Sequence, residues 1–407
     1  MSVLRKKIKE SFLSSNSRLL FSIIGSLTLV PLLITHLGPE KYGMVMSITV
    51  ITGLTVCFES GVAKYIVKKA GNHGIEYNIV YILTLSLINV LSTCVLLFLL
   101  SMLFEFNNEH YAYYVVSITV LLLMSINTLL KSILEYNLLF KEIQTYAFIN
   151  SFSMLVYLFF ISLISLDVRH LFLAHFFSVI SGSIYLVCKL GKIELKNINR
   201  QPFVDVFRER NVLLKYYFMG LSVSGFHPLS RALFLTCFGT TGFVIWDVSS
   251  RLAQVANSII TSLSLPIYSL AIREPKSVSK NAVLKIFIGS LMMYVLGMVF
   301  YYFTRCYIVK YFSLSEVYNS IDTIIFFLVF GFCCNGVSEP FSRYIIATSN
   351  LKDYVMIKMS SIMMMFVLFI SNTLSDVNFS IWYFIINVLT SFLISIMFYR
   401  RNIYSYG

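Results

Sequence analysis

The sequence predicts an all-α integral membrane protein of about twelve transmembrane helices, with both termini in the cytoplasm. The chain has 407 residues, of which 57% are hydrophobic and 13% charged, whereas a soluble domain is about 25% charged. Apolar stretches long enough to cross a bilayer recur along the whole chain. Basic residues lie between these stretches and form no single polar face, so the net charge of +13 does not indicate a nucleic-acid-binding protein.

Twelve stretches of about 20 residues have the composition of transmembrane helices. They lie near 17–37, 42–66, 79–104, 111–134, 146–166, 169–188, 214–237, 242–269, 283–304, 321–347, 355–374 and 379–399. The first stretch follows a basic N-terminus, as the core of a secretory signal does. It is too long for such a core and has no small-residue cleavage site, so we interpret it as a retained first span.

The basic residues set the predicted orientation. With the N-terminus inside, 25 of the 32 Lys and Arg residues fall in cytoplasmic segments, among them Lys131 and Lys358. Four fall in outer connections (Lys41, Arg169, Arg305 and Lys310) and three within spans (Arg231, Arg251 and Arg343). Cytoplasmic loops of membrane proteins carry such an excess of positive charge. The sequence therefore predicts a multi-pass protein of a cytoplasmic membrane.

The longest connection between spans is basic and lies between the sixth and the seventh. It divides the chain into an N-terminal six-helix bundle (1–188), a cytoplasmic linker (189–213) and a C-terminal six-helix bundle (214–407). Six spans in each half give both halves the same orientation, which is the parallel pseudo-repeat of some transporters. The outer connections are short, so they leave no room for an extramembrane catalytic domain.

The first helix of each half repeats one detail. It contains an interior proline, Pro31 or Pro228, and then ends on a glycine, Gly38 or Gly239. Interrupted helices at corresponding positions of two halves are the best sequence indication of a transport site. We therefore predict that Pro31 and Pro228 act as hinges.

Charged residues recur within the spans on polar helical stripes. An ionised side chain near the bilayer centre costs about 3 kcal/mol, so each needs a partner or a task. We expect five cations to line a central cavity: Arg18, Lys64, Arg231, Arg251 and Arg343. The structural alternative also stands, because Asp247/Arg251 and Glu339/Arg343 are i,i+4 pairs that can neutralise each other. Lys64 and Arg18 could equally extend to the inner interface.

Three acids are candidates for coupling transport to an ion: Glu59, Asp247 and Glu339. Glu59 has no basic residue four positions away that could pair with it along a helix. Of the three acids, it is therefore the one whose ionised form desolvation should disfavour most. The seven cysteines and six histidines show no metal-ligand spacing, and the chain has no nucleotide-binding loop. The sequence thus predicts no metal, no cofactor and no catalytic residue.

The stretch LVPLLITHLGPEKYGMVMSITVITGLTVCFESGVAKYIVKKA (Leu29 to Ala70) resembles the pattern of polysaccharide-unit flippases. That pattern places a glycine after the first helix, then a Tyr-Gly pair, an acid followed by glycine, and a basic residue. These positions are held here by Gly38, Tyr42, Gly43, Glu59, Gly61 and Lys64. The family more often has aspartate and arginine where this chain has Glu59 and Lys64. Gly239, Pro266 and Ser269 echo the pattern in the second half.

The chain is similar to the Wzx-type O-antigen flippases of the multidrug/oligosaccharidyl-lipid/polysaccharide exporter superfamily. The resemblance implies two six-helix bundles around a cation-lined cavity. It also implies transfer of an undecaprenyl-pyrophosphate-linked oligosaccharide from the cytoplasmic to the periplasmic leaflet of a bacterial inner membrane, with a polysaccharide polymerase and a chain-length regulator as candidate partners. Cavity cations would offset the desolvation of the diphosphate. Protonation of Glu59 would alternate with diphosphate binding by Lys64.

Two alternatives remain open. One is a cation-coupled drug or lipid II exporter of the same superfamily. The other is an enzyme, a membrane-embedded polysaccharide polymerase or acyltransferase. The short outer connections and the absence of an H-x(4)-D pair argue against the enzyme.

Overall fold

The computed structural model describes residues 5–13, 28–43, 46, 53, 59, 61–68, 84–91, 94–95, 111–162, 168–190, 208–273, 278–312, 321–348, 351–371 and 375–403. Within these residues every regular element is helical. The chain forms two compact units: unit 1 comprises Met1–Met46 and Leu229–Gly407, and unit 2 comprises Ser47–Pro228. These units follow packing, whereas the predicted bundles at 1–188 and 214–407 follow connectivity, so the predicted boundaries stay a prediction.

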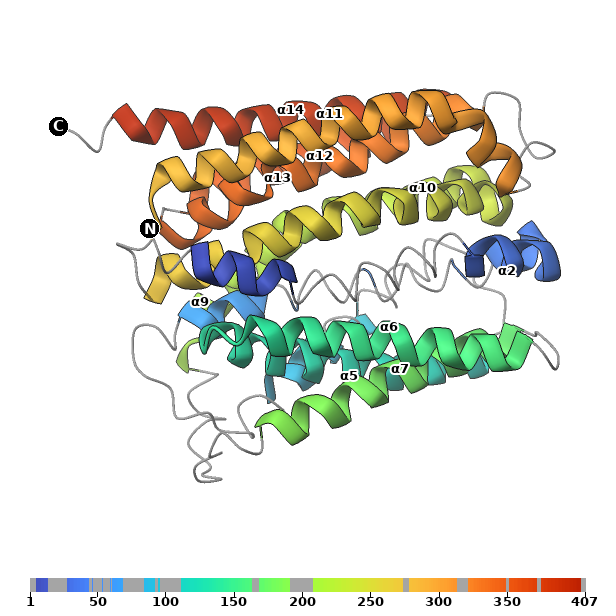
Figure 1. Ribbon diagram of the computed structural model, residues 1–407, viewed down its shortest axis with the longest axis horizontal. Coiled ribbons are helices and arrows are strands. Elements are labelled where there is room, and N and C mark those ends of the chain that lie inside the picture. The colour runs from blue at the N-terminus through green and yellow to red at the C-terminus, as the bar shows by residue number, and fades with distance from the viewer. Residues whose placement is uncertain are drawn as a thin grey trace. The chain divides into compact units, whose positions relative to one another are not determined.

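Unit 2 is built on three mutually packed helices: α5 (Tyr111–Tyr136), α6 (Phe140–Ser162) and α7 (Val168–Leu190). Figure 1 shows them side by side in green. A fourth helix, α9 (Arg210–Ser224), belongs to the same unit. Residues 61–68 are also helical and contact α9, where the Tyr65 and Tyr216 rings meet edge to face with centroids 5.4 Å apart.

Unit 1 contains the remaining helices of the structure's described part. These are α2 (Val30–Leu37), α10 (Phe226–Arg273, from Leu229 onward), α11 (Lys280–Tyr311), α12 (Ile321–Thr348), α13 (Leu351–Ile370) and α14 (Asp376–Ile403). α12 packs against α11, α13 and α14, and α13 also packs against α14. This group is drawn from orange to red in Figure 1.

An aromatic cluster holds α10, α12 and α14 together. Trp246 is fully buried and lies edge to face with Phe332 and Tyr383, with ring centroids 5.1 Å away in each case. Phe234 and Phe379 complete the cluster at a centroid distance of 5.3 Å. Such pairs contribute about 0.5–1.5 kcal/mol each beyond the area they bury. The cluster therefore fixes the part of α10 that carries the charged residues described below.

Eight of the described helices are long and apolar enough to cross a membrane: 119–136, 140–161, 173–190, 242–273, 280–308, 321–348, 352–370 and 377–400. They coincide with the predicted spans four to six and eight to twelve, which confirms these spans. Most of the predicted spans one to three lies outside the described residues. The seventh is interrupted: α9 ends at Ser224, Gly225 follows, and a new helix begins at Phe226.

The structure corrects one boundary. The sequence placed Arg305 and Lys310 in an outer connection, but α11 continues through Tyr311. Within this last part of the helix, Arg305 lies 3.8 Å from the Asp322 carboxylate and 5.0 Å from the centre of the Tyr302 ring. At the other end, the Ser279 hydroxyl accepts a hydrogen bond from the Ala282 amide at 3.3 Å and caps the helix.

The repeated glycines behave as the sequence predicted. Gly38 follows α2 with φ 79°, and Gly239 interrupts α10 with φ 67°. Among the described glycines these two alone have positive φ, a conformation that other residues rarely adopt. α10 is consequently two helices that meet at Gly239.

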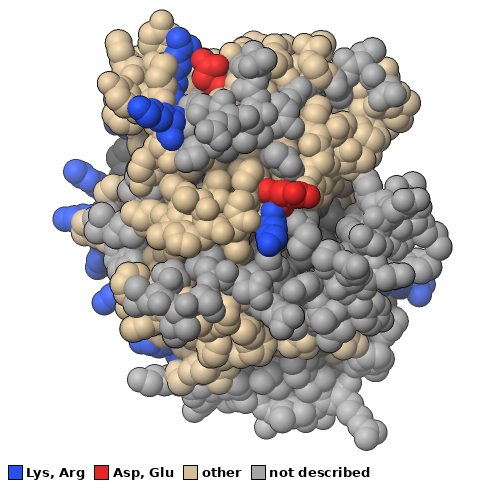
Figure 2. Space-filling model, turned by 90° about the vertical axis from the view of Figure 1, so that its right-hand side faces the viewer, with Lys and Arg blue, Asp and Glu red and all other residues tan. Residues whose placement is uncertain are grey.

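Figure 2 views the molecule from the side on which α2 lies in Figure 1, and its described surface carries few charged side chains.

Candidate functional site

A buried charged cluster occupies unit 1 just beyond the Gly239 kink. Arg251 Nε lies 2.6 Å from Asp247 Oδ2, and Arg231 Nη2 lies 3.5 Å from Asp247 Oδ1. The Tyr42 hydroxyl donates a hydrogen bond of 2.6 Å to the same carboxylate. Met46 closes the cluster, because its carbonyl oxygen and sulfur accept hydrogen bonds from Arg231 and Arg251 at 3.3 and 3.5 Å.

Two guanidinium groups thus share one carboxylate. Asp247 is 3% exposed and Tyr42 fully buried, so water does not replace these contacts. The Arg231 guanidinium also lies 4.9 Å from the centre of the Phe243 ring, where a cation is attracted to the ring face. Among the described residues, the cluster holds two guanidinium groups and one carboxylate.

The Tyr-Gly pair noted in the sequence now has a physical reason. Tyr42 supplies the hydrogen bond to Asp247, and Gly43 lets the backbone approach α10 closely. A methyl group at Gly43 would collide with the carbonyl group of Thr240. The pair therefore joins the segment after α2 to the turn of α10 that precedes Asp247.

The second predicted pair also forms. Arg343 Nε lies 2.9 Å from Glu339 Oε1 along α12. Arg343 Nη1 donates a further hydrogen bond of 3.5 Å to the Leu265 carbonyl on α10. Both i,i+4 pairs are therefore real ion pairs, and the second also connects two helices. This geometry agrees with the structural interpretation of Glu339 and Arg343 as well as with a cavity role.

Lys358 was missed by the sequence analysis, which counted it in a cytoplasmic segment. The structure buries it in α13 with 6% exposure, and its Nζ donates a hydrogen bond of 3.2 Å to Asn335 Oδ1 on α12. Asn335 in turn donates to Asn387 on α14, and Asn387 donates to the Tyr383 carbonyl at 2.7 Å. A polar network therefore crosses three helices. The polar run of Lys358, Ser360 and Ser361 within an apolar span could have indicated this network from the sequence.

Glu59 is the buried acid of unit 2. It is 1% exposed, and neither carboxyl oxygen has a hydrogen-bond partner in the part of the chain that the structure describes. Ser125 and Thr128 of α5 interact with it electrostatically without reaching hydrogen-bond geometry. Lys131, one turn further along α5, is the basic residue that acts on it. The sequence analysis placed Lys131 in a cytoplasmic segment and proposed Lys64 as the basic residue that acts together with Glu59.

Lys131 and Lys64 lie in different surroundings. The Lys131 ammonium lies 5.2 Å from the centre of the Tyr146 ring on α6. Lys64 is half-buried and five residues after Glu59, which on an ideal helix is about 140° around the axis. The alternation between Glu59 and Lys64 stays a prediction, and Lys131 is a second basic residue that acts on Glu59.

The acid-x-Gly motif also has a packing role. A methyl group at Gly61 would collide with the Tyr216 carbonyl. This glycine therefore lets the backbone of residues 61–68 approach the backbone of α9 closely. The Tyr217 hydroxyl on α9 donates to Asn89, and Asn89 donates to Ser125 at 3.3 Å. Near the start of α9, the Tyr65 hydroxyl bonds Glu209, whose pKa is raised by burial. Glu59 thus lies in a polar interior that several helices supply.

The remaining predicted residues are placed as follows. Arg18 lies outside the described residues. Pro31 falls in the first turn of α2, and Pro228 in the first turn of α10 directly after the Gly225 break. A proline there loses no helical hydrogen bond. The boundary between the compact units falls at Pro228. The hinge role of the two prolines stays a prediction.

The chain matches no protein-family model and no curated protein. Solved structures resemble it over nearly its whole length. A mutant form of the Vibrio cholerae MATE transporter VcmN is 14% identical, with a TM-score of 0.74 and 98% of each chain covered. A MATE transporter in complex with MaL6 is 16% identical, with a TM-score of 0.71, covering 98% of this chain and 96% of that one.

The fold is that of MATE transporters. A third structure, described as the outward-facing conformation of a multidrug resistance MATE family transporter of the MOP superfamily, matches at 16% identity with a TM-score of 0.66 and the same coverage. The predicted all-helical membrane fold with two helical lobes is therefore confirmed. None of these three structures is described as a polysaccharide flippase.

Proposed function

We propose that this protein is a secondary transporter that exports an amphipathic compound across a cytoplasmic membrane by alternating access coupled to a cation gradient. The observation that carries the proposal is the similarity of fold, over 98% of the chain, to transporters that include a multidrug resistance protein. No covalent chemistry is needed, so the protein is proposed not to be an enzyme.

Glu59 is the proposed coupling residue. Glu59 is buried, and among the described residues no group makes a well-formed hydrogen bond to its carboxylate, although Ser125, Thr128 and Lys131 act on it. Such a carboxylate is costly in an ionised form, so it favours uptake of a proton or an alkali cation. Asp247 is less suited to this task because two arginines and a tyrosine already satisfy it. Glu339 is likewise ion-paired with Arg343.

The test of coupling uses purified protein in proteoliposomes. Efflux of a fluorescent cationic dye should depend on an imposed proton or sodium gradient, and Glu59→Gln should abolish this dependence. Glu339→Gln is the matched control and should retain it. Gradient dependence that survives in Glu59→Gln and disappears in Glu339→Gln would transfer the coupling role to Glu339.

A second candidate substrate is an undecaprenyl-pyrophosphate-linked O-antigen or polysaccharide repeat unit, flipped to the periplasmic leaflet of a bacterial inner membrane. The specific observation in its favour is that two guanidinium groups, those of Arg231 and Arg251, lie together at Asp247, since a diphosphate needs charge-assisted hydrogen bonds when it leaves water. The Leu29 to Ala70 motif supports it as well. A polysaccharide polymerase and a chain-length regulator would then be partners in the same membrane.

Gene deletion separates the two substrates. If the substrate is a lipid-linked saccharide, the deletion strain should lose surface polysaccharide and regain it with the wild-type gene, and should not regain it with Arg231→Ala/Arg251→Ala at equal expression. If the substrate is a drug, polysaccharide should stay normal while sensitivity to cationic compounds rises. Normal polysaccharide and unchanged sensitivity would reject both.

A further inference from the structure

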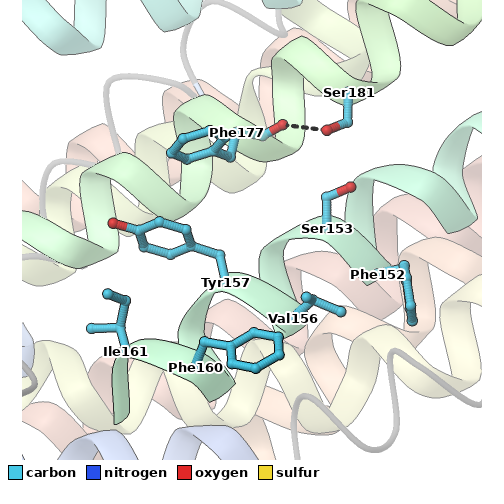
Figure 3. Close-up of a pocket in the computed structure, with 8 residues that line it drawn as sticks. All are labelled: Phe152, Ser153, Val156, Tyr157, Phe160, Ile161, Phe177 and Ser181. Carbon is cyan, nitrogen blue, oxygen red and sulfur yellow. Dashed lines mark hydrogen bonds between the residues drawn. The ribbon is translucent and has the colours of Figure 1, made fainter. Parts of the chain in front are cut away.

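A groove runs between α6 and α7 on the surface of unit 2, with a volume of about 420 Å³. Aromatic side chains form its walls, and two serines lie between them. Figure 3 shows Phe152, Ser153, Tyr157 and Phe160 on α6 beside Phe177 and Ser181 on α7.

The two serines create the groove. Both are small, whereas their neighbours Phe152 and Tyr157 on α6 and Phe177 on α7 are large and aromatic. Tyr157 and Phe177 stack across the two helices with ring centroids 5.2 Å apart, which holds the walls in place. The Ser181 hydroxyl donates to the Phe177 carbonyl of its own helix at 2.8 Å. Its polar atom is thereby satisfied, so the groove presents an essentially apolar lining.

The groove faces the hydrocarbon of the membrane. Both helices are long and apolar enough to span it, and little of either is buried within the protein. Phe160 is 61% exposed and Phe177 48% exposed. In a soluble protein such a surface would need a protein partner, but on helices that cross a bilayer the hydrocarbon chains of the lipids surround it.

The length of the groove fits one leaflet. Its α6 wall runs from Phe152 to Ile161, which at 1.5 Å per residue is about 14 Å. Half of the hydrocarbon core is about 15 Å thick. In the predicted orientation α6 ends on the outer side, so the groove occupies the outer leaflet.

The outer end of the groove is polar. The Tyr157 hydroxyl lies 3.3 Å from His170 Nδ1. His170 lies near the start of the described part of α7. The groove therefore has an apolar wall about one leaflet long, with the polar Tyr157–His170 pair beside it.

We propose that this groove binds one acyl chain of an outer-leaflet phospholipid, whose headgroup lies beyond the outer end of the groove. This inference does not rest on the proposed transport function. The bound phospholipid would stay with the protein when surrounding lipid is exchanged for detergent.

Native mass spectrometry of the detergent-purified full chain tests the proposal. The wild-type protein should retain one phospholipid, identified by its mass, and Ser153→Leu/Ser181→Leu should lose it because the larger side chains fill the groove. Cys188→Leu enlarges an exposed side chain of α7 outside the groove and should retain it. Equal retention in the filled and control variants would overturn the proposal, as would a retained polyprenyl lipid in place of phospholipid.

A photolabelling measurement on the wild-type protein covers the case in which the filled variant does not fold. A phospholipid with a photoreactive diazirine in its acyl chain should label the peptides that contain residues 152–161 and 177–181. The internal reference is the exposed apolar surface of α11, which includes Leu296 and Phe303. Labelling of α6 and α7 no stronger than that of α11 would refute the groove as a binding site.

Discussion

Replacing Asp247 with Asn would remove the one carboxylate that holds the cluster of unit 1 together. The variant keeps the size of the side chain and part of its hydrogen bonding, but Arg231 and Arg251 would both lose the carboxylate that they contact. Their contacts to Asp247 are 3.5 and 2.6 Å long, and Asp247 is 3% exposed, so solvent would not compensate. Breaking a buried ion pair of this kind costs about 3–5 kcal/mol.

That cost should appear as a lower midpoint of thermal unfolding in detergent. For a domain of 150–250 residues each kcal/mol lowers the midpoint by about 2–4 °C, so Asp247→Asn should lower it by roughly 6–20 °C. Ser250→Ala is the matched control on the same helix. Its hydroxyl donates to the Asp247 carbonyl at 2.8 Å, and losing one such bond costs about 1 kcal/mol. If the two variants unfold at the same temperature, the cluster does not stabilise unit 1 as argued.

Three further predictions concern other contacts, each of which lies within a single unit. Tyr42→Phe removes the 2.6 Å hydrogen bond to Asp247 and should cost about 1.5–3 kcal/mol in chemical denaturation; an unchanged unfolding midpoint would mean that the bond contributes nothing net. Gly61→Ala should lower the unfolding midpoint because its methyl group would meet the Tyr216 carbonyl, whereas Gly289→Ala in α11 meets nothing within 4 Å and should raise stability by about 0.5–1 kcal/mol. The reverse order of these two glycine variants would contradict the packing described for residues 61–68. Lys358→Met should lower folded yield because the Asn335 side-chain oxygen would lose the hydrogen bond that Lys358 donates. Lys352→Met, on the exposed start of the same helix, should leave yield unchanged. Equal yields would show that the Lys358 network is dispensable.

Local features of the fold were predictable from the sequence. Apolar length alone located eight of the spans, because a helix that crosses hydrocarbon must satisfy its backbone internally and expose apolar side chains. The i,i+4 spacing located both ion pairs, since residues four apart lie on one helical face. Gly38 and Gly239 were found from their repeated position, and their positive φ gives the reason.

Contacts between distant segments were not predictable in the same way. Nothing in the local pattern pairs Tyr42 with Asp247, which is 205 positions later. Lys131 and Lys358 were assigned to cytoplasmic segments because a lysine near a span end commonly extends to the interface. Burial of Lys358 depends on Asn335, which a different helix supplies. The end of α11 was misplaced for a related reason, because Asp322 belongs to the next helix.

The composition of unit 1 has a consequence for how the protein is made. Residues 1–46 leave the ribosome well before the rest of unit 1, which begins at Leu229. The Ser11 hydroxyl bonds the Ser262 carbonyl at 2.9 Å, and Tyr42 bonds Asp247, so neither contact can form until α10 has been synthesised. At about 5–20 residues per second, the intervening residues 47–228 take roughly 10–40 s to translate. During that interval the N-terminal segment must stay in the membrane without its final neighbours, while unit 2 is already complete in sequence. A nascent chain stalled before Leu229 would therefore leave residues 1–46 open to degradation or to capture by a membrane chaperone.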